Sequence, residues 1–203
     1  MTDNNGTVAS NSSNQEKNFD LLDSVYSAAA DGEINKFQQH AGVLDQILTP
    51  NDNTILSIHI TARQPPSSRI SQNMNFMREI LGKCPELLWK ANKKGKTLLH
   101  MATRHGHADV SKYLLEECKK PYQNDQELAI KATRQMLQMI NEAKDTALHE
   151  AVCYNHIDVV QLLTEEDGDL PYDSNIAGET PLYLADMVCR NSEEDFRQLH
   201  FTS

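Results

Sequence analysis

An internal repeat constrains the fold of this chain more than any other feature of its sequence. The segment TALHEAVCYNHIDVVQLL at 146–163 repeats the residue order of TLLHMATRHGHADVSKYLL at 97–115, which lies 49 residues earlier. An ungapped alignment pairs identical residues in order: Leu148 with Leu99, His149 with His100, Ala151 with Ala102, His156 with His107, Asp158 with Asp109 and Val159 with Val110. Self-similarity of this kind predicts a fold built from stacked copies of one structural unit.

Each copy predicts a pair of helices joined by a tight turn. Thr97 and Thr146 suit the N-cap of a first helix, because a threonine oxygen accepts a bond from an otherwise unpaired backbone N–H. That helix ends at Gly106 in one copy and at Asn155 in the other, residue types that readily enter the left-handed conformation. The second helix carries one apolar stripe, formed by Val110, Tyr113 and Leu114 and in the copy by Val159, Leu162 and Leu163. Neither helix can bury its apolar residues alone, so we predict an all-α solenoid of stacked repeats.

The unit resembles the ankyrin repeat, whose signature is T-P-L-H-x-A, followed by G-H and V-x-x-L-L. The segments at 97–107 and 146–156 match this signature, and TPLYLA at 180–185 matches it with Tyr183 at the histidine position. The resemblance implies that His100 and His149 bridge backbone groups of neighbouring repeats. It also implies structural roles for the other signature residues, namely Thr97, Gly106, Thr146 and Thr180.

We expect about five helix–turn–helix repeats between residues 20 and 190, with 95–127 and 144–176 the best formed. VYSAAADGEINKF at 25–37 is interpreted as a degenerate first repeat that has Gly32 as its helix stop. Residues 1–19 are rich in Asn, Ser and Thr and are predicted to be disordered. Residues 191–203 are predicted to form a C-terminal tail or a weak cap.

Two of the expected repeats carry insertions. The second repeat opens at Thr54, and its helices are separated by RQPPSSRIS at 63–71, which is longer than an ankyrin turn. The third repeat spans 49 residues from Thr97 to Thr146, against a usual ankyrin period of about 33. The extra stretch at 124–144 is predicted to form an additional or extended amphipathic helix, because its apolar residues recur at helical spacing. These residues are Leu128, Ala132, Met136 and Met139 or Ile140.

Composition excludes several classes of function. The net charge of −10 disfavours nonspecific binding to nucleic acid or to an anionic membrane. No uncharged apolar run approaches the ~18 residues of a membrane-spanning helix. The polar segment 1–20 does not have the form of a signal peptide, and the four cysteines are predicted to be free thiols of a cytoplasmic protein.

The histidines suggest catalysis as an alternative function. His100, His105 and His107 lie close in sequence, but they lack a carboxylate or thiol partner at metal-binding spacing. No phosphate-binding glycine loop, nucleophile elbow, H-E-x-x-H or EF-hand pattern occurs. We therefore expect a non-enzymatic protein without cofactor or metal, in preference to a metal-dependent hydrolase.

The ankyrin resemblance implies a concave protein-binding face, formed by exposed first-helix positions and by the fingers, the turns that lead into each first helix. Removing the core positions leaves the candidate partner-binding residues Lys93, Lys94, Met101, Arg104, His105, Lys144, Glu150 and Tyr154, with Cys153, Leu184 and Met187 beside them. Arg104 aligns with Cys153 and His105 with Tyr154, so these four side chains should form one patch. Arg, Tyr and Met are enriched in interface cores.

A narrower resemblance covers about residues 20–187. The segments DSVYSAAADGE, RQPPSSRIS, PELLWKANKKGKTLLHMATRHGH and KDTALHEAVCYNH are similar to the plant accelerated-cell-death family. That family usually continues into a multi-helix membrane domain. The resemblance implies protein interactions in defence and salicylic-acid-linked cell death, and association with membrane-anchored relatives at the inner face of the plasma membrane. A truncated or regulatory form of a longer membrane-anchored protein is the alternative interpretation.

Overall fold

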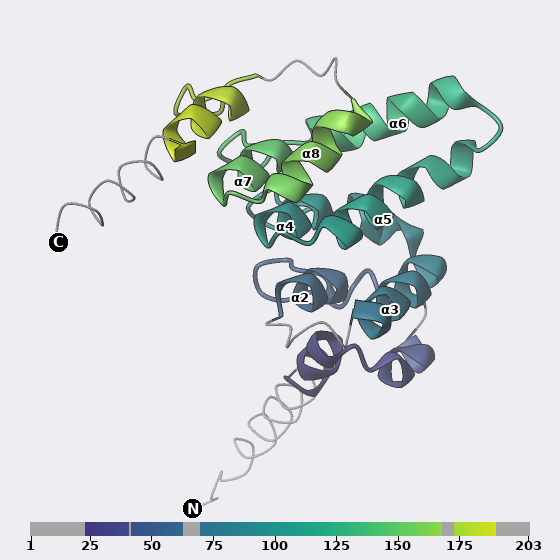
Figure 1. The fold of residues 1–203 in the computed structure, drawn as a ribbon. Helices are drawn as coiled ribbons and strands as arrows, with labels where there is room; N and C mark the ends of the chain where they lie inside the picture. The colour runs from purple at the N-terminus through teal and green to yellow at the C-terminus, as the bar shows by residue number, and fades with distance from the viewer. Residues whose placement is uncertain (1–22, 41, 63–69, 168–172, 190–203) are drawn as a thin grey trace, which may run out of the picture.

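The computed structural model describes residues 23–40, 42–62, 70–167 and 173–189, which form a stack of helix pairs (Figure 1). In this part of the chain every regular element is a helix, and the one β-type pairing is an isolated bridge between Leu48 and Thr54. The predicted all-α repeat solenoid is therefore confirmed. Among the described residues, no helix combines the length and apolar character needed to cross a bilayer.

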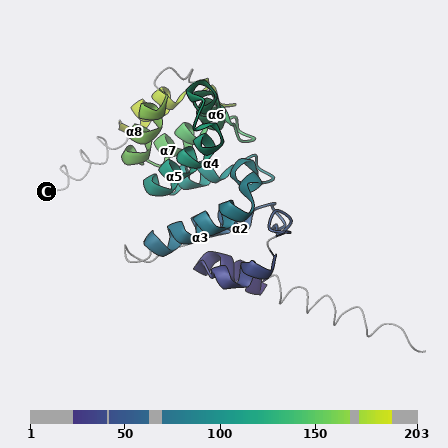
Figure 2. The same cartoon turned by 90° about the vertical axis from the view of Figure 1, so that its right-hand side faces the viewer.

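The elements follow the repeat order along the chain. In sequence they are a helix at 23–31, η1 (Ile34–His40), α2 (Ile55–Thr61), α3 (Ile70–Lys83), η2 (Pro85–Trp89), α4 (Leu98–Arg104), α5 (Ala108–Lys119), η3 (Lys120–Tyr122), α6 (Gln126–Gln138), α7 (Ala147–Cys153), α8 (Ile157–Glu166) and a helix at 181–189. The first helices α2, α4 and α7 stack on one side, with the second helices α3, α5 and α8 beside them (Figures 1 and 2).

The first helices begin and end as the sequence predicts. The Thr97 side chain accepts the backbone N–H of His100, and the His100 ring in turn accepts the backbone N–H of Thr97, which completes a capping box. Thr146 and His149 repeat the arrangement in α7. Beyond α4 and α7, Gly106 and Asn155 adopt φ of 71° and 56°, in the left-handed region.

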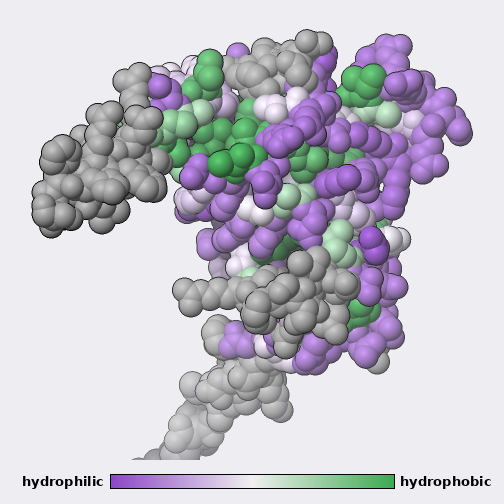
Figure 3. Space-filling model, viewed as in Figure 1, coloured by the Kyte–Doolittle hydropathy of each residue, from purple (hydrophilic) through white to green (hydrophobic). Residues whose placement is uncertain are grey.

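Burial of small and apolar residues holds the stack together. Ala102 and Ala151 are fully buried, which lets the backbones of α4 and α7 approach closely. In the second helices Val110, Tyr113, Leu114, Val159 and Leu163 are buried as predicted, and Leu162 is half-buried. Each helix pair thus buries its apolar residues against the next pair, and hydrophilic residues predominate among the coloured residues of the face shown in Figure 3.

The insertion in the third repeat contains the predicted helix, α6, which packs against α5. Ala132 and Met136 are buried, but Leu128 and Ile140 are 42% and 52% exposed, which contradicts part of the predicted apolar stripe. The start of α6 extends beyond the stacked repeats (Figure 1), and Ile140 follows the end of the helix, where the chain turns away. Both positions therefore lie outside the buried centre of the helix, which is formed by Ala132, Thr133, Met136 and Leu137.

An ion pair fastens α6 to the following repeat. The Arg134 guanidinium donates from Nε and Nη2 to the two carboxylate oxygens of Asp167, at 2.6 and 2.9 Å. Asp167 follows the last residue of α8, so this bidentate contact joins the insertion to the fourth repeat. The predicted tails at 1–19 and 191–203, and residues 63–69 of the Pro-Pro loop, lie outside the described residues.

Candidate functional site

The fingers are five-residue turns at 49–53, 92–96, 141–145 and 175–179, each just before the threonine that caps a first helix. In the last three, the first residue is asparagine and its backbone N–H donates to the carbonyl of the fifth residue, at 2.9–3.0 Å. Its side-chain oxygen accepts the backbone N–H of that same fifth residue. The fourth residue has positive φ in every finger, whether it is Asp52, Gly95, Lys144 or Gly178.

Backbone hydrogen bonds also run from finger to finger. Lys93 donates its N–H to the carbonyl of Asn51 at 3.1 Å, and Glu142 donates to Lys94 at 3.0 Å. Ile176 continues the series by donating to Ala143 at 2.9 Å. These bonds fix the spacing of the fingers, so side chains from successive fingers keep constant positions relative to one another.

The signature histidines make the bridges that the resemblance implies. The His100 ring is fully buried; its Nδ1 accepts the Thr97 N–H at 3.3 Å, and its Nε2 donates to the carbonyl of Asp145 at 3.0 Å. His149 repeats both contacts, with Thr146 at 3.1 Å and Glu179 at 3.2 Å. Burial lowers the pKa of His100, which favours the neutral ring that these two bonds require.

A groove of about 480 Å³ lies between the first helices and the fingers of repeats three to five. Its lining residues are Lys94, Lys96 and Arg104 from repeat three; Asn141, Glu142, Ala143, Asp145, His149, Glu150, Cys153 and Tyr154 from repeat four; and Asn175, Glu179 and Leu184 from repeat five. Most of its lining residues therefore have polar or charged side chains.

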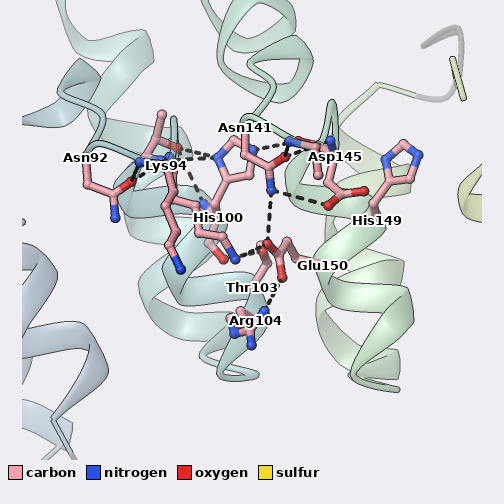
Figure 4. A network of polar contacts seen from close by, with 12 residues as sticks. Asn92, Lys94, His100, Thr103, Arg104, Asn141, Asp145, His149 and Glu150 are labelled. Atoms are coloured by element: carbon pink, nitrogen blue, oxygen red, sulfur yellow. Dashed lines mark hydrogen bonds and ion pairs between the residues drawn. The ribbon is translucent and has the colours of Figure 1, made fainter. Parts of the chain in front are cut away.

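A buried carboxylate lies at the centre of the groove. The Glu150 residue is 5% exposed, and its Oε1 accepts from Lys96 Nζ at 2.5 Å and from Asn141 Nδ2 at 3.3 Å. Its Oε2 accepts from Arg104 Nη1 at 3.0 Å (Figure 4). Two cations and an amide compensate the buried charge, as burial of a carboxylate requires.

The same arginine stacks on an aromatic ring. The guanidinium carbon of Arg104 lies 4.3 Å from the centroid of the Tyr154 ring, within the range of a cation–π interaction. Tyr154 is 42% exposed, and the Arg104 side chain is 39% exposed. The groove thus presents a rigid arginine–tyrosine pair to solvent.

This geometry of fingers, histidine bridges and stacked helix pairs agrees with the comparison with known families. A profile of ankyrin repeats, in three copies, matches residues 70–199. The chain belongs to the ankyrin-repeat family. Ankyrin repeats indicate a protein–protein interaction module.

Individual ankyrin proteins are similar to parts of the chain. Protein ACCELERATED CELL DEATH 6 of Arabidopsis thaliana is 22% identical over 174 residues, which cover 83% of this chain and 24% of that protein. Rabankyrin-5 of Mus musculus is 33% identical over 88 residues, 41% of this chain and 7% of that protein. Putative ankyrin repeat protein FPV014 of fowlpox virus is 32% identical over 94 residues, 46% of this chain and 18% of that protein. The chain therefore spans at most about a quarter of these relatives.

The ankyrin array brings half of the predicted partner-binding residues into one groove. Lys94, Arg104, Glu150 and Tyr154 line it, together with Cys153 and Leu184. Lys93, Met101, His105 and Lys144 are not among its lining residues. Of the expected patch, Arg104, Cys153 and Tyr154 are together in the groove.

His105 is not among the residues that line the groove. Its ring is stacked nearly parallel to that of His107, with 6.0 Å between the centroids. Partial desolvation of the ring lowers the pKa of His105, and electrostatic interactions with His107 and with the Arg104 guanidinium lower it further. His105 therefore neighbours the groove without forming its wall.

Two residues that were predicted to lie on the exposed binding face are buried, so this part of the prediction was wrong. Met101 and Glu150 are each only 5% exposed. They hold the same position in α4 and α7, one residue after the signature histidine, and α4 packs directly on α7. Met101 therefore belongs to the hydrophobic core, and Glu150 acts through the side chains that it binds.

Sequence reasoning missed several groove residues, chiefly Lys96, Asn141, Asp145, Asn175 and Glu179. The spacing of asparagine to threonine, which is the same at 92–97, 141–146 and 175–180, was the available signal. Lys144 replaces the glycine of the other two fingers, which hides the match at 141–146. Within the residues that the structure places, no group of three or more His, Cys, Asp or Glu side chains could hold a metal ion.

The cysteines are free thiols of two kinds. Cys84 and Cys118 are buried, and Cys153 and Cys189 are exposed. Burial raises the pKa of the Cys84 and Cys118 thiols, which keeps them protonated and unreactive. The buried pair is part of the core, and Cys153 is the thiol that faces the groove.

Proposed function

We propose that the chain binds protein partners through the groove between α4 and α7, with Arg104 and Tyr154 at the centre of the interface. The observation that carries this proposal is the arginine stacked on the half-exposed tyrosine, above the buried Glu150 carboxylate. Arg and Tyr are among the residues that dominate the binding energy of protein interfaces. Because Glu150 already holds Arg104 in place, binding immobilises little additional side-chain freedom.

The process that this interaction serves is proposed from similarity. The resemblance to ACCELERATED CELL DEATH 6 supports a role in plant defence and cell-death signalling. In this proposal the chain acts in the cytoplasm without catalysing a reaction. It reaches the inner face of the plasma membrane by associating with membrane-anchored relatives.

A quantitative pull-down tests the binding site. The tagged wild-type chain and the double variant Arg104→Ala/Tyr154→Ala are incubated with plant leaf extract that contains tagged ACCELERATED CELL DEATH 6, and the captured proteins are quantified by mass spectrometry. The double variant should lose the partners that the wild type captures. Glu165→Ala, an exposed change on α8 outside the groove, should keep them. Equal capture by the double variant would place the partner site elsewhere, and α6 is the next candidate.

Partner identity is tested in the same samples. Enrichment of ACCELERATED CELL DEATH 6 by the wild type, and its loss from the double variant, would support association with membrane-anchored relatives. If other proteins are captured through the groove and this one is absent, the binding site stands and the proposed membrane association fails.

A further inference from the structure

The charges that line the groove are sorted along the array. The lining residues from repeat three include three cations, Lys94, Lys96 and Arg104, and no carboxylate. Those from repeats four and five include the carboxylates of Glu142, Asp145, Glu150 and Glu179, and neither lysine nor arginine. One end of the groove is therefore cationic and the other anionic, with Glu150 at the boundary between them (Figure 4).

The cationic end keeps a surplus of positive charge. Lys96 and Arg104 share the single carboxylate of Glu150, which neutralises one of the two charges. Lys94 is exposed beside them. An acidic side chain that enters this end would meet a net positive charge and the remaining donors of the Arg104 guanidinium.

At the anionic end, side-chain amides rather than cations contact the carboxylates of Asp145 and Glu179. Asp145 accepts hydrogen bonds from Asn141 Nδ2 at 3.3 Å and from Asn175 Nδ2 at 2.9 Å. Asn175 Nδ2 also lies 3.4 Å from Glu179 Oε2. Across the described part of the chain, no ion pair involves Glu142, Asp145 or Glu179. This end therefore keeps its negative charge available to a cationic group.

We propose that the groove selects an extended partner segment that carries an acidic residue at one end and a basic residue at the other. The acidic residue lies over Lys94 and Arg104, and the basic residue lies over Glu142, Asp145 and Glu179. A segment of a single charge sign is rejected, because one of its ends faces a like charge. This inference rests on the proposed function and specifies the chemistry of the partner.

A random peptide library displayed on phage tests the charge rule without a known partner. Wild-type chain should enrich peptides that contain both an acidic and a basic residue separated along the sequence. Lys94→Glu should remove the acidic preference and keep the basic one, and Glu142→Lys should do the reverse. For individual synthetic peptides from the wild-type selection, each reversal should weaken binding about five- to tenfold, as measured by fluorescence anisotropy.

Matched reversals on α5 provide the controls, because Lys112 and Glu116 are exposed on a second helix outside the groove. Lys112→Glu and Glu116→Lys change the net charge by the same amounts and should leave peptide selection unchanged. Enrichment of peptides of one charge sign, or of purely apolar peptides, would overturn the inference. If the enrichment of such peptides still depends on Arg104 and Tyr154, the proposed function of the groove stands. Failure to enrich any peptide would also overturn the inference, and the pull-down would then test the groove separately.

Discussion

The His156 imidazole occupies the space that a side chain on Gly106 would need. An ideal Cβ placed on Gly106 would lie 2.6 Å from His156 Nδ1, well inside van der Waals contact. Gly106 also has φ of 71°, and the Nε2 of His156 donates to the carbonyl of Arg104 at 2.9 Å. The turn after α4 thus combines a left-handed backbone with a histidine from the next repeat, and Gly106 lies two residues after Arg104, which lines the groove.

Gly106→Ala is therefore expected to destabilise the array by about 2–4 kcal/mol. A left-handed non-glycine residue costs about 1–2 kcal/mol, and displacing His156 adds the loss of its hydrogen bond. Urea unfolding measures the change. Gly178→Ala is the matched control, because φ there is 79° but no atom lies within 4 Å of the added Cβ. If both variants lose the same stability, the contact with His156 is unimportant.

His149→Ala should lower the free energy of unfolding by about 1–3 kcal/mol, because it leaves partly buried backbone groups of Thr146 and Glu179 without their partner. Thermal unfolding followed by circular dichroism checks this expectation. His105→Ala, at an exposed ring, should change stability by less than about 0.5 kcal/mol. An unchanged melting temperature for His149→Ala would show that the bridge between repeats is dispensable.

The stability of the array should fall as the pH falls below about 6.5. Burial lowers the pKa of His100 in the folded chain, so between the folded and unfolded pKa values the unfolded chain binds more protons. The His100 contribution is complete above the unfolded pKa and is lost as the pH falls toward the folded value. Across this pH range, the urea concentration at the unfolding midpoint should change less with pH for His100→Gln than for wild type. The same pH dependence of the midpoint in both proteins would show that groups other than His100 cause it.

Glu150→Gln should destabilise the fold by about 1–3 kcal/mol, because Lys96 and Arg104 then lose the carboxylate between them. It should also weaken peptide binding, since Arg104 loses the contact that fixes it over Tyr154. Glu165→Gln on α8 removes one exposed carboxylate and is the matched control. Calorimetric unfolding and peptide titration of both variants separate the two effects. A Glu150→Gln chain that binds as tightly as wild type would show that Arg104 keeps its position unaided.

The parts of the fold that local sequence determines were predictable. Thr97, His100 and Gly106 lie within ten residues of one another, and their roles in capping, bridging and turning follow from residue type and spacing. The helix at 126–138 was predictable for the same reason, since its buried residues recur at helical intervals. These features depend on residues that are close together in the sequence of one repeat, and the same residue order recurs in the next repeat.

The groove depended on contacts between repeats, which spacing alone does not reveal. Met101 and Glu150 follow the signature histidines, a position expected to be exposed, yet the packing of α4 on α7 buries both. The pairing of Lys96 with Glu150 joins residues 54 positions apart. The alignment of repeats predicted that Arg104, Cys153 and Tyr154 lie near one another, but not that Arg104 stacks on Tyr154, which follows its aligned position, Cys153.

Amide hydrogen exchange of the chain, alone and bound to the partner captured in the pull-down, tests most directly whether the groove is the binding site. If the groove is the binding site, exchange should slow in the fingers at 92–96 and 141–145 and in α4 and α7, which bound the groove. Helices α5 and α8, on the other side of the stack, should exchange at unchanged rates. Protection confined to α5, α6 or α8, with α4, α7 and the fingers unaffected, would show that the partner binds outside the groove.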